Sequence, residues 1–225
     1  MTPREAPPGP GVAEALAVLA GWVGLELALA ARVPAPRSPT AALLWTGLVR
    51  TVESTVLLAW AQLRGWGPRR LGITGPAAGR GLRAGLGVAA GFAAAVAAVE
   101  TAGRFSGLGS ILELLAGPRP SGGELAALLA AGAVVAPAFE ELLFRGVLYG
   151  ALRRHWRPAP AVFLTTVLFA AAHLGRTPVP WTQALGGVVF CVVYERSRSL
   201  WAPYVVHALG NAALFLLPWV AQAHP

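Results

Sequence analysis

Residues 134–145 read VVAPAFEELLFR, and this apolar segment carries two adjacent carboxylates, Glu140 and Glu141, followed by one arginine, Arg145. The flanking residues are again apolar, so the three charged groups lie within one long hydrophobic run. An ionisable side chain at the centre of a membrane helix costs about 2.5–3.5 kcal/mol on insertion scales, and such residues mark function by default. The segment therefore predicts a membrane helix with a functional polar centre.

The next apolar runs carry polar groups of the same kind. Phe169 and His173 lie four residues apart in one run, and His207 and Asn211 lie four residues apart in the last. Costly groups in three successive apolar regions are difficult to explain as accident.

The composition indicates a membrane protein with little mass outside the bilayer. Of the 225 residues, 56% are hydrophobic and only 12% are charged, whereas about 25% are charged in an ordinary soluble domain. Apolar runs near the ~20 residues that span a bilayer recur along the chain. We expect an all-α, polytopic helical bundle of about seven transmembrane helices. The expected helices are 11–31, 41–63, 82–100, 124–152, 159–174, 180–195 and 200–219.

The formal net charge of +8 does not indicate nucleic-acid binding. The basic residues are all arginine and gather in short loops, a pattern typical of the positive-inside rule rather than of a soluble basic face. Eleven arginines fall in one alternating set of loops: Arg4, Arg64, Arg69, Arg70, Arg80, Arg83, Arg153, Arg154, Arg157, Arg196 and Arg198. Five fall in the other set: Arg32, Arg37, Arg104, Arg119 and Arg176. This bias predicts that the N-terminus lies inside and the C-terminus outside.

The spacing of the polar groups suggests how they divide the work. Glu141 and Arg145 are four apart and share a helix face, while Glu140 points about 100° away. We expect a buried Glu141–Arg145 ion pair and a free Glu140. Pro137 should kink this helix and loosen a backbone carbonyl. The Phe169 ring should pack beside His173.

Two kinds of chemistry fit these groups. In one, Glu140 and His173 activate a water molecule, while His207 and Asn211, which share a face, bind the developing oxyanion. In the other, Glu140, His173 and His207 hold Zn²⁺ as three N/O ligands with water in the fourth position. The His-Glu-x-x-His motif of zinc proteases does not occur, so the spacing gives no independent support for a metal.

Other polar residues have structural interpretations. Arg50 and Glu53 should form a pair in the second helix, and acidic residues near helix ends should pair locally or reach the interface; these are Glu14, Glu26 and Glu100. Cys191 is a lone buried thiol, and His155 and His224 lie in a loop and in the tail. Small-xxx-small spacing at Gly81/Gly85 and Gly87/Gly91 is compatible with close helix contacts.

The three motifs resemble those of the CAAX-protease and bacteriocin-processing family of intramembrane endopeptidases (the CPBP or Abi family). Glu140, Glu141 and Arg145 match its Glu-Glu-x-x-x-Arg motif, Phe169 and His173 its Phe-x-x-x-His motif, and His207 and Asn211 its His-x-x-x-Asn motif. The resemblance implies a helical core around a water-filled cavity. It also implies proteolysis in which Glu140 and His173 activate water, His207 and Asn211 stabilise the oxyanion, and Glu141, Arg145 and Phe169 support them.

The resemblance covers about residues 124–215 and implies three parts of the chain. Residues 1–120 hold N-terminal transmembrane helices, 121–219 hold the CPBP-type catalytic core, and 220–225 form a short tail. Glu14 and Glu26 interrupt the first apolar run, which favours a retained helix over a signal peptide. We expect a multi-pass protein of a bacterial inner membrane, with the bilayer and a membrane-associated protein or peptide substrate as partners.

Two other functions are compatible with the same residues. The chain could be a non-catalytic bacteriocin-immunity or scaffold protein that keeps the fold and binds a peptide. It could also be a proton-coupled transporter, because Glu and His chains serve as proton relays, although no internal repeat of the transporter kind is visible. The metal-free endopeptidase is preferred because base and oxyanion roles need no zinc.

Overall fold

The computed structural model describes residues 9–34, 36–110, 112–113, 116–174 and 180–221, and the fold within them is all-α, as expected. The helices are α1 (Val12–Arg32), α2 (Pro39–Leu63), α3 (Pro76–Phe105), a continuous rod over 122–152, α8 (Pro158–Ala171), α9 (Trp181–Ser197) and α10 (Trp201–Ala221). The rod consists of α5 (Gly122–Ala127), η1 (Leu128–Val135), α6 (Ala136–Glu141), η2 (Leu142–Tyr149) and α7 (Gly150–Leu152). These seven helical units confirm the helical bundle predicted from the apolar runs.

Five of these helices are long and apolar enough to cross a membrane, namely α1, α2, α3, the rod and α10. The α8 helix is apolar but has only 14 residues, about 21 Å at the helix rise of ~1.5 Å per residue. The α9 helix has 17 residues. The five longer helices are therefore long enough to cross a bilayer core of about 30 Å, whereas α8 is too short to cross it alone.

The α3 helix begins at Pro76 and ends at Phe105, so it is longer than the expected range of 82–100. Arg80 and Arg83 lower the hydropathy of its first turns, but arginine is a good helix former. Pro76 at the start has the fixed φ of a helix and lacks the N–H group that would have no partner there.

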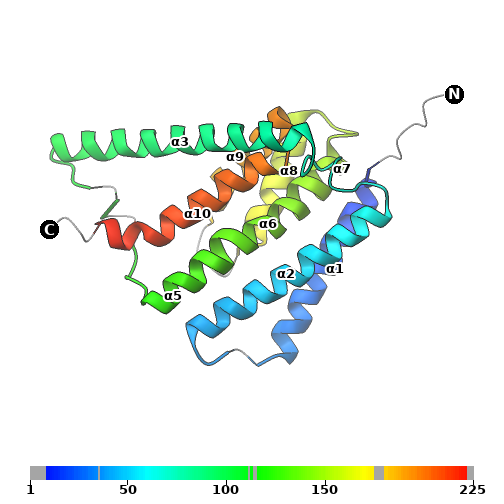
Figure 1. The fold of residues 1–225 in the computed structure, drawn as a ribbon, viewed down its shortest axis with the longest axis horizontal. Helices are drawn as coiled ribbons and strands as arrows, with labels where there is room; N and C mark the ends of the chain where they lie inside the picture. The colour runs from blue at the N-terminus through cyan, green and yellow to red at the C-terminus, as the bar shows by residue number, and fades with distance from the viewer. Residues whose placement is uncertain (1–8, 35, 111, 114–115, 175–179, 222–225) are drawn as a thin grey trace.

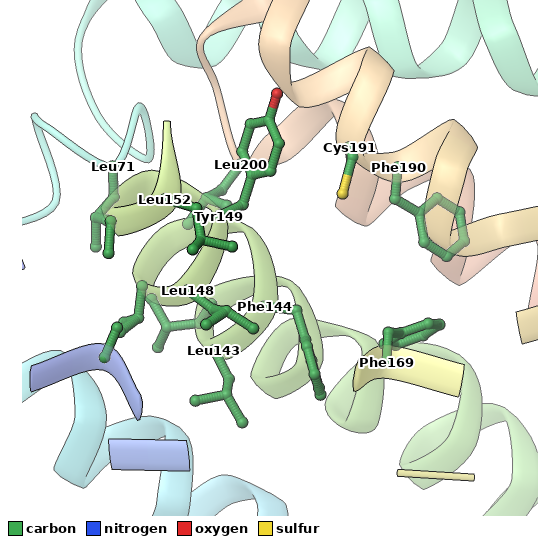
Figure 2. Packing of buried hydrophobic residues seen from close by; sticks show 14 of the residues in the cluster. Leu71, Leu143, Phe144, Leu148, Tyr149, Leu152, Phe169, Phe190, Cys191 and Leu200 are labelled. Atoms are coloured by element: carbon green, nitrogen blue, oxygen red, sulfur yellow. The ribbon is translucent and has the colours of Figure 1, made fainter. Parts of the chain in front are cut away.

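The rod is the centre of the bundle, between α2 on one side and α10 on the other (Figure 1). Half of its most apolar 18-residue window is buried, against 6% for α1 and for α3, whose surfaces face outward. All residues of η2 are buried, and Leu143, Phe144, Leu148 and Tyr149 pack there with Leu71, Phe169 and Leu200 (Figure 2).

Two stretches of the rod, η1 and η2, have π-helical hydrogen bonding. The first ends at Val135, two residues before Pro137, which lacks an N–H group and disrupts the α-helical pattern. π-Helical turns are rare and frequently occur at functional sites. The sequence predicted a kink and a loosened backbone carbonyl at Pro137. The structure has the π-helical segment η1 just before this proline, within a helix that continues to Leu152.

Two glycines allow close approach of α3 and the preceding loop to the start of α10. At Gly72, φ is +69°, and a Cβ would lie 2.5 Å from backbone atoms of Arg198 and Ser199. At Gly85 a Cβ would lie 2.7 Å from the Ala202 carbonyl oxygen. Hydrogen bonds join the same segments, because Ser199 Oγ donates to the Gly72 carbonyl at 2.7 Å and Trp201 Nε1 to the Ile73 carbonyl at 2.7 Å.

The two small-xxx-small pairs therefore differ. Gly81 and Gly85 face Ser199, Ala202 and Val205, which confirms a close helix contact. Gly87 and Gly91 have nothing within 4 Å of a built Cβ and face away from the described protein.

Candidate active site

The two adjacent carboxylates are the last residues of α6, where α6 meets η2 within the rod. They point in different directions, as the helix geometry predicts. Glu141 Oε1 accepts a hydrogen bond from Arg145 Nη1 at 3.1 Å, with the two side chains 1% and 0% exposed. The expected Glu141–Arg145 ion pair is confirmed, and Glu140 takes no part in it.

A third group joins this pair from α10. His207 Nδ1 lies 2.8 Å from Glu141 Oε1, the same oxygen that accepts from Arg145. A carboxylate oxygen accepts, so Nδ1 carries the hydrogen. Glu141 thus links the rod to α10 and fixes one nitrogen of the His207 ring. The sequence did not predict this bond, which joins residues 66 positions apart.

Aromatic rings enclose the buried guanidinium. The Cζ atom of Arg145 lies 4.5 Å from the ring centroid of Phe169 and 5.0 Å from that of Phe190. A desolvated cation over an aromatic face gains about 2 kcal/mol or more. Arg145 Nη2 also donates to the Gly187 carbonyl at 3.4 Å. Arg145 therefore ties α8 and α9 to the rod.

Glu140 faces both histidines. Its Oε2 atom lies 3.8 Å from His173 Nε2 and 3.7 Å from His207 Nε2. These distances exceed a hydrogen bond, and among the described residues this buried oxygen has no hydrogen-bond partner. The three side chains are 8–14% exposed. The predicted convergence of Glu140, His173 and His207 is thus present in the structure.

The hydrogen bonds of the imidazoles define their free nitrogens. His173 Nδ1 lies 2.8 Å from the Phe169 carbonyl oxygen, which can only accept, so Nδ1 donates. In the neutral ring the remaining Nε2 carries a lone pair, and this atom faces Glu140. The Phe169 ring packs beside His173 with centroids 4.9 Å apart, as expected.

Asn211 lies one helical turn beyond His207 on α10. Its Nδ2 donates to the Gly132 carbonyl at 2.9 Å, which connects α10 to η1. A carboxamide nitrogen has two hydrogens, and the bond to Gly132 uses one of them. The site therefore draws on the rod, α8 and α10, with α9 behind it.

The residues set aside from the site lie elsewhere. Arg50 pairs with Glu53 as expected and also with Glu26 of α1 at 2.8 Å. Glu14 and Glu100 pair with Arg64 and Arg104. Cys191 is a buried free thiol, and His155 is exposed in a loop. His224 lies outside the described residues.

Phe190 is a residue of the site that the sequence did not single out. It stacks on His207 with centroids 4.5 Å apart and an interplanar angle of 18°. An apolar residue in an apolar helix carries no signal of its own, and Phe190 lies in none of the three motifs. The Gly186-Gly187 pair one turn earlier was the only local sign of an unusual packing position.

As a metal site, the group has two nitrogen donors and one oxygen donor, which fits Zn²⁺ in kind. Across the described residues, however, no group of three His, Cys, Asp or Glu side chains is arranged to hold a metal ion.

Comparison with known proteins shows what this part of the chain is similar to. Residues 122–213 match the family described as type II CAAX prenyl endopeptidase Rce1-like. The matched segment contains all seven motif residues, and the resemblance inferred from them is confirmed.

Two curated relatives match a similar length of chain. One is "Putative membrane peptidase YdiL" of Bacillus subtilis (strain 168), 24% identical over 90 residues, which are 40% of this chain and 36% of the relative. The other is "UPF0177 protein YaiH" of Lactococcus lactis subsp. lactis (strain IL1403), 34% identical over 82 residues, which are 36% of this chain and 34% of the relative. The similarity thus spans about a third of each relative's length. No solved structure matches the chain.

Proposed function

We propose that this chain is an intramembrane endopeptidase that hydrolyses a peptide bond of a membrane-associated protein or peptide. The observation that carries the proposal is the position of Glu140 Oε2, 3.7–3.8 Å from the Nε2 atoms of two imidazoles inside an apolar bundle. The Rce1-like family and the membrane-peptidase relative support the same class of activity.

In the proposed reaction, Glu140 is the general base. A water molecule between Glu140 and His173 gives a proton to the carboxylate, and its oxygen attacks the carbonyl carbon of the peptide. A C–O bond forms while the carbonyl π electrons move to oxygen. Collapse of this intermediate breaks the C–N bond, and the proton held by Glu140 passes to the leaving amine, with His173 as the relay.

His207 and Asn211 would stabilise the oxyanion. Because His207 Nδ1 keeps its hydrogen bond to Glu141, donation through Nε2 requires a proton on both ring nitrogens. The free amide hydrogen of Asn211 is the second donor. Preorganised donors of this kind are each worth about 10²–10³ in kcat.

Substitution of Glu140 tests the proposal. Glu140→Gln keeps the side-chain shape but removes the base, so cleavage should fall by about 10²–10⁴-fold. The assay uses purified protein in proteoliposomes and a quenched-fluorescent peptide library, with and without a farnesylated cysteine. Glu113→Gln is the matched control, because Glu113 is half-exposed and distant in sequence from the motifs. A folded Glu140→Gln protein that retains full activity would contradict the mechanism.

The same assay separates the other possibilities. A wild-type protein that binds peptides but cleaves none, with Glu140→Gln preserving its cellular phenotype, would indicate an immunity or scaffold protein. Proton-dependent flux in liposomes would indicate a transporter.

A metal-free mechanism is proposed because the four side chains already supply a base and two oxyanion donors. Activity should then survive 1,10-phenanthroline, and elemental analysis of active protein should find no stoichiometric zinc. Loss of activity with the chelator and its return with Zn²⁺ would instead assign Glu140, His173 and His207 as ligands.

A further inference from the structure

We infer that Phe190 of α9 is a positioning residue for the site, which holds the His207 imidazole in the plane that directs Nε2 toward Glu140. The catalytic consequence of this role rests on the proposed function. The positions of the Phe190 and His207 rings do not depend on the proposed function.

A single hydrogen bond does not fix the orientation of an imidazole ring. The bond from His207 Nδ1 to Glu141 Oε1 locates one nitrogen, but rotation of the ring about that contact would swing Nε2 away from Glu140. A second constraint on the plane of the ring is needed to keep Nε2 at its 3.7 Å distance.

Phe190 supplies that constraint. Its ring lies nearly parallel to His207, 4.5 Å away with an 18° interplanar angle, while Phe169 meets the same imidazole edge-on at 6.0 Å and 83°. Rotation of the imidazole out of its plane would drive it into the face of Phe190. The face of the Phe190 ring and the edge-on contact with Phe169 thus fix the plane of the His207 imidazole and its position within that plane.

Phe190 also couples this orientation to the charged network. The guanidinium of Arg145 lies 5.0 Å from the Phe190 centroid, so one phenyl ring contacts both groups that bond to Glu141 Oε1. The rings of Phe190 and Phe169 point toward one another from α9 and α8 (Figure 2), with their centroids 6.3 Å apart. The ring is 8% exposed, and its position is therefore determined by packing.

Gly186 provides the space for the ring. A Cβ at Gly186 would lie 3.1 Å from both Cε2 and Cζ of Phe190, tighter than ordinary contact. These residues are four apart and share a face of α9. The sequence Gly186-x-x-x-Phe190 is therefore a further functional element of the chain, in addition to the three motifs.

The first test observes His207 directly and does not depend on proteolysis. In protein with labelled histidines in nanodiscs, the His207 Cε1 proton should show an upfield ring-current shift in the NMR spectrum, assigned with His207→Gln. Phe190→Leu should remove the shift and Phe190→Tyr should retain it. Gly186→Ala should reduce the shift by displacing the Phe190 ring, although none of the residues that touch His207 is itself substituted. Gly91→Ala, where a Cβ meets nothing within 4 Å, is the control.

The second test measures the consequence with a quenched-fluorescent peptide that the wild type cleaves. Phe190→Leu should lower kcat on the order of 10²-fold, the effect of a small misplacement of a reacting group, with KM unchanged, and Phe190→Tyr should restore kcat. A folded Phe190→Leu protein with the wild-type shift of His207, or with wild-type kcat, would overturn the inference. If the wild type cleaves no peptide, the proposed function fails, and the ring-current measurement still decides whether Phe190 positions His207.

Discussion

Glu141 is the residue at which the charges of the site meet. Its Oε1 atom accepts from Arg145 and from His207, and both Glu141 and Arg145 are almost completely buried. Two roles follow for one carboxylate: it neutralises a guanidinium in a low-dielectric setting, and it holds the imidazole proposed to bind the oxyanion. Glu140, one residue earlier, takes part neither in the ion pair with Arg145 nor in the bond that holds His207 Nδ1.

Loss of the Glu141 charge should destabilise the protein strongly. Glu141→Gln leaves the guanidinium of Arg145, 0% exposed, without an anionic partner, and removing one partner of a buried pair costs about 3–5 kcal/mol. The free energy of unfolding in detergent micelles, from titration with a denaturing detergent, measures the change.

A matched substitution at an exposed ion pair is the control. Glu14→Gln removes the partner of Arg64, whose side chain is 56% exposed, and exposed pairs contribute about 0–1 kcal/mol. If the two substitutions lowered the free energy of unfolding equally, burial would not determine the strength of the Glu141–Arg145 pair.

At the scale of helices, the contact between α3 and α10 depends on the absence of side chains. Gly85→Ala would place a methyl group 2.7 Å from the Ala202 carbonyl and 2.8 Å from Val205 Cβ. Overpacking of this kind costs about 1–3 kcal/mol. The substitution should lower the thermal unfolding midpoint in detergent.

Gly87→Ala is the control for this contact, on the same helix and two residues away. Nothing lies within 4 Å of a Cβ there, and alanine favours a helix by up to about 1 kcal/mol over glycine. Its midpoint should remain unchanged or rise. A fall as large as that of Gly85→Ala would argue against the α3–α10 contact.

For the molecule as a whole, the sequence predicted the helices better than the contacts between them. Run lengths and hydropathy located seven helical units, because a bilayer demands long apolar helices. Residues four apart predicted the Glu141–Arg145 pair, the Phe169–His173 contact and a free Glu140, because these depend on local helix geometry.

The remainder of the site depends on contacts between distant segments. The Glu141–His207 bond, the Asn211–Gly132 bond and the Phe190–His207 stack each join different helices, and no local spacing encodes them. The π-helical segment η2 has no sequence signal either, because the apolar residues that form it also suit an α-helix.

Loop contacts in the structure bear on the predicted orientation in the membrane. The arginine-rich loops at 64–75 and 198–200 are hydrogen-bonded through Leu71 and Leu200 and through Gly72 and Ser199. Arg64 reaches Glu14 at the start of α1. At the far end of α10, Arg119 lies over the Trp219 ring at 4.4 Å. Loops of the arginine-rich set are therefore together at one end, and Arg119, of the arginine-poor set, meets the opposite end of α10.

Because arginine-rich loops stay in the cytoplasm, the loop at His155 should be inside and the loop at Gly117 outside. Single cysteines at these exposed positions, in a Cys191→Ala background, test this with a membrane-impermeant maleimide. Gly117→Cys should react in intact spheroplasts, and His155→Cys should react only after the membrane is opened. Gly117 suits the substitution because a Cβ there meets nothing within 4 Å. The reverse labelling pattern would show that the bundle has the opposite orientation in the membrane, and that the arginine bias failed to predict it.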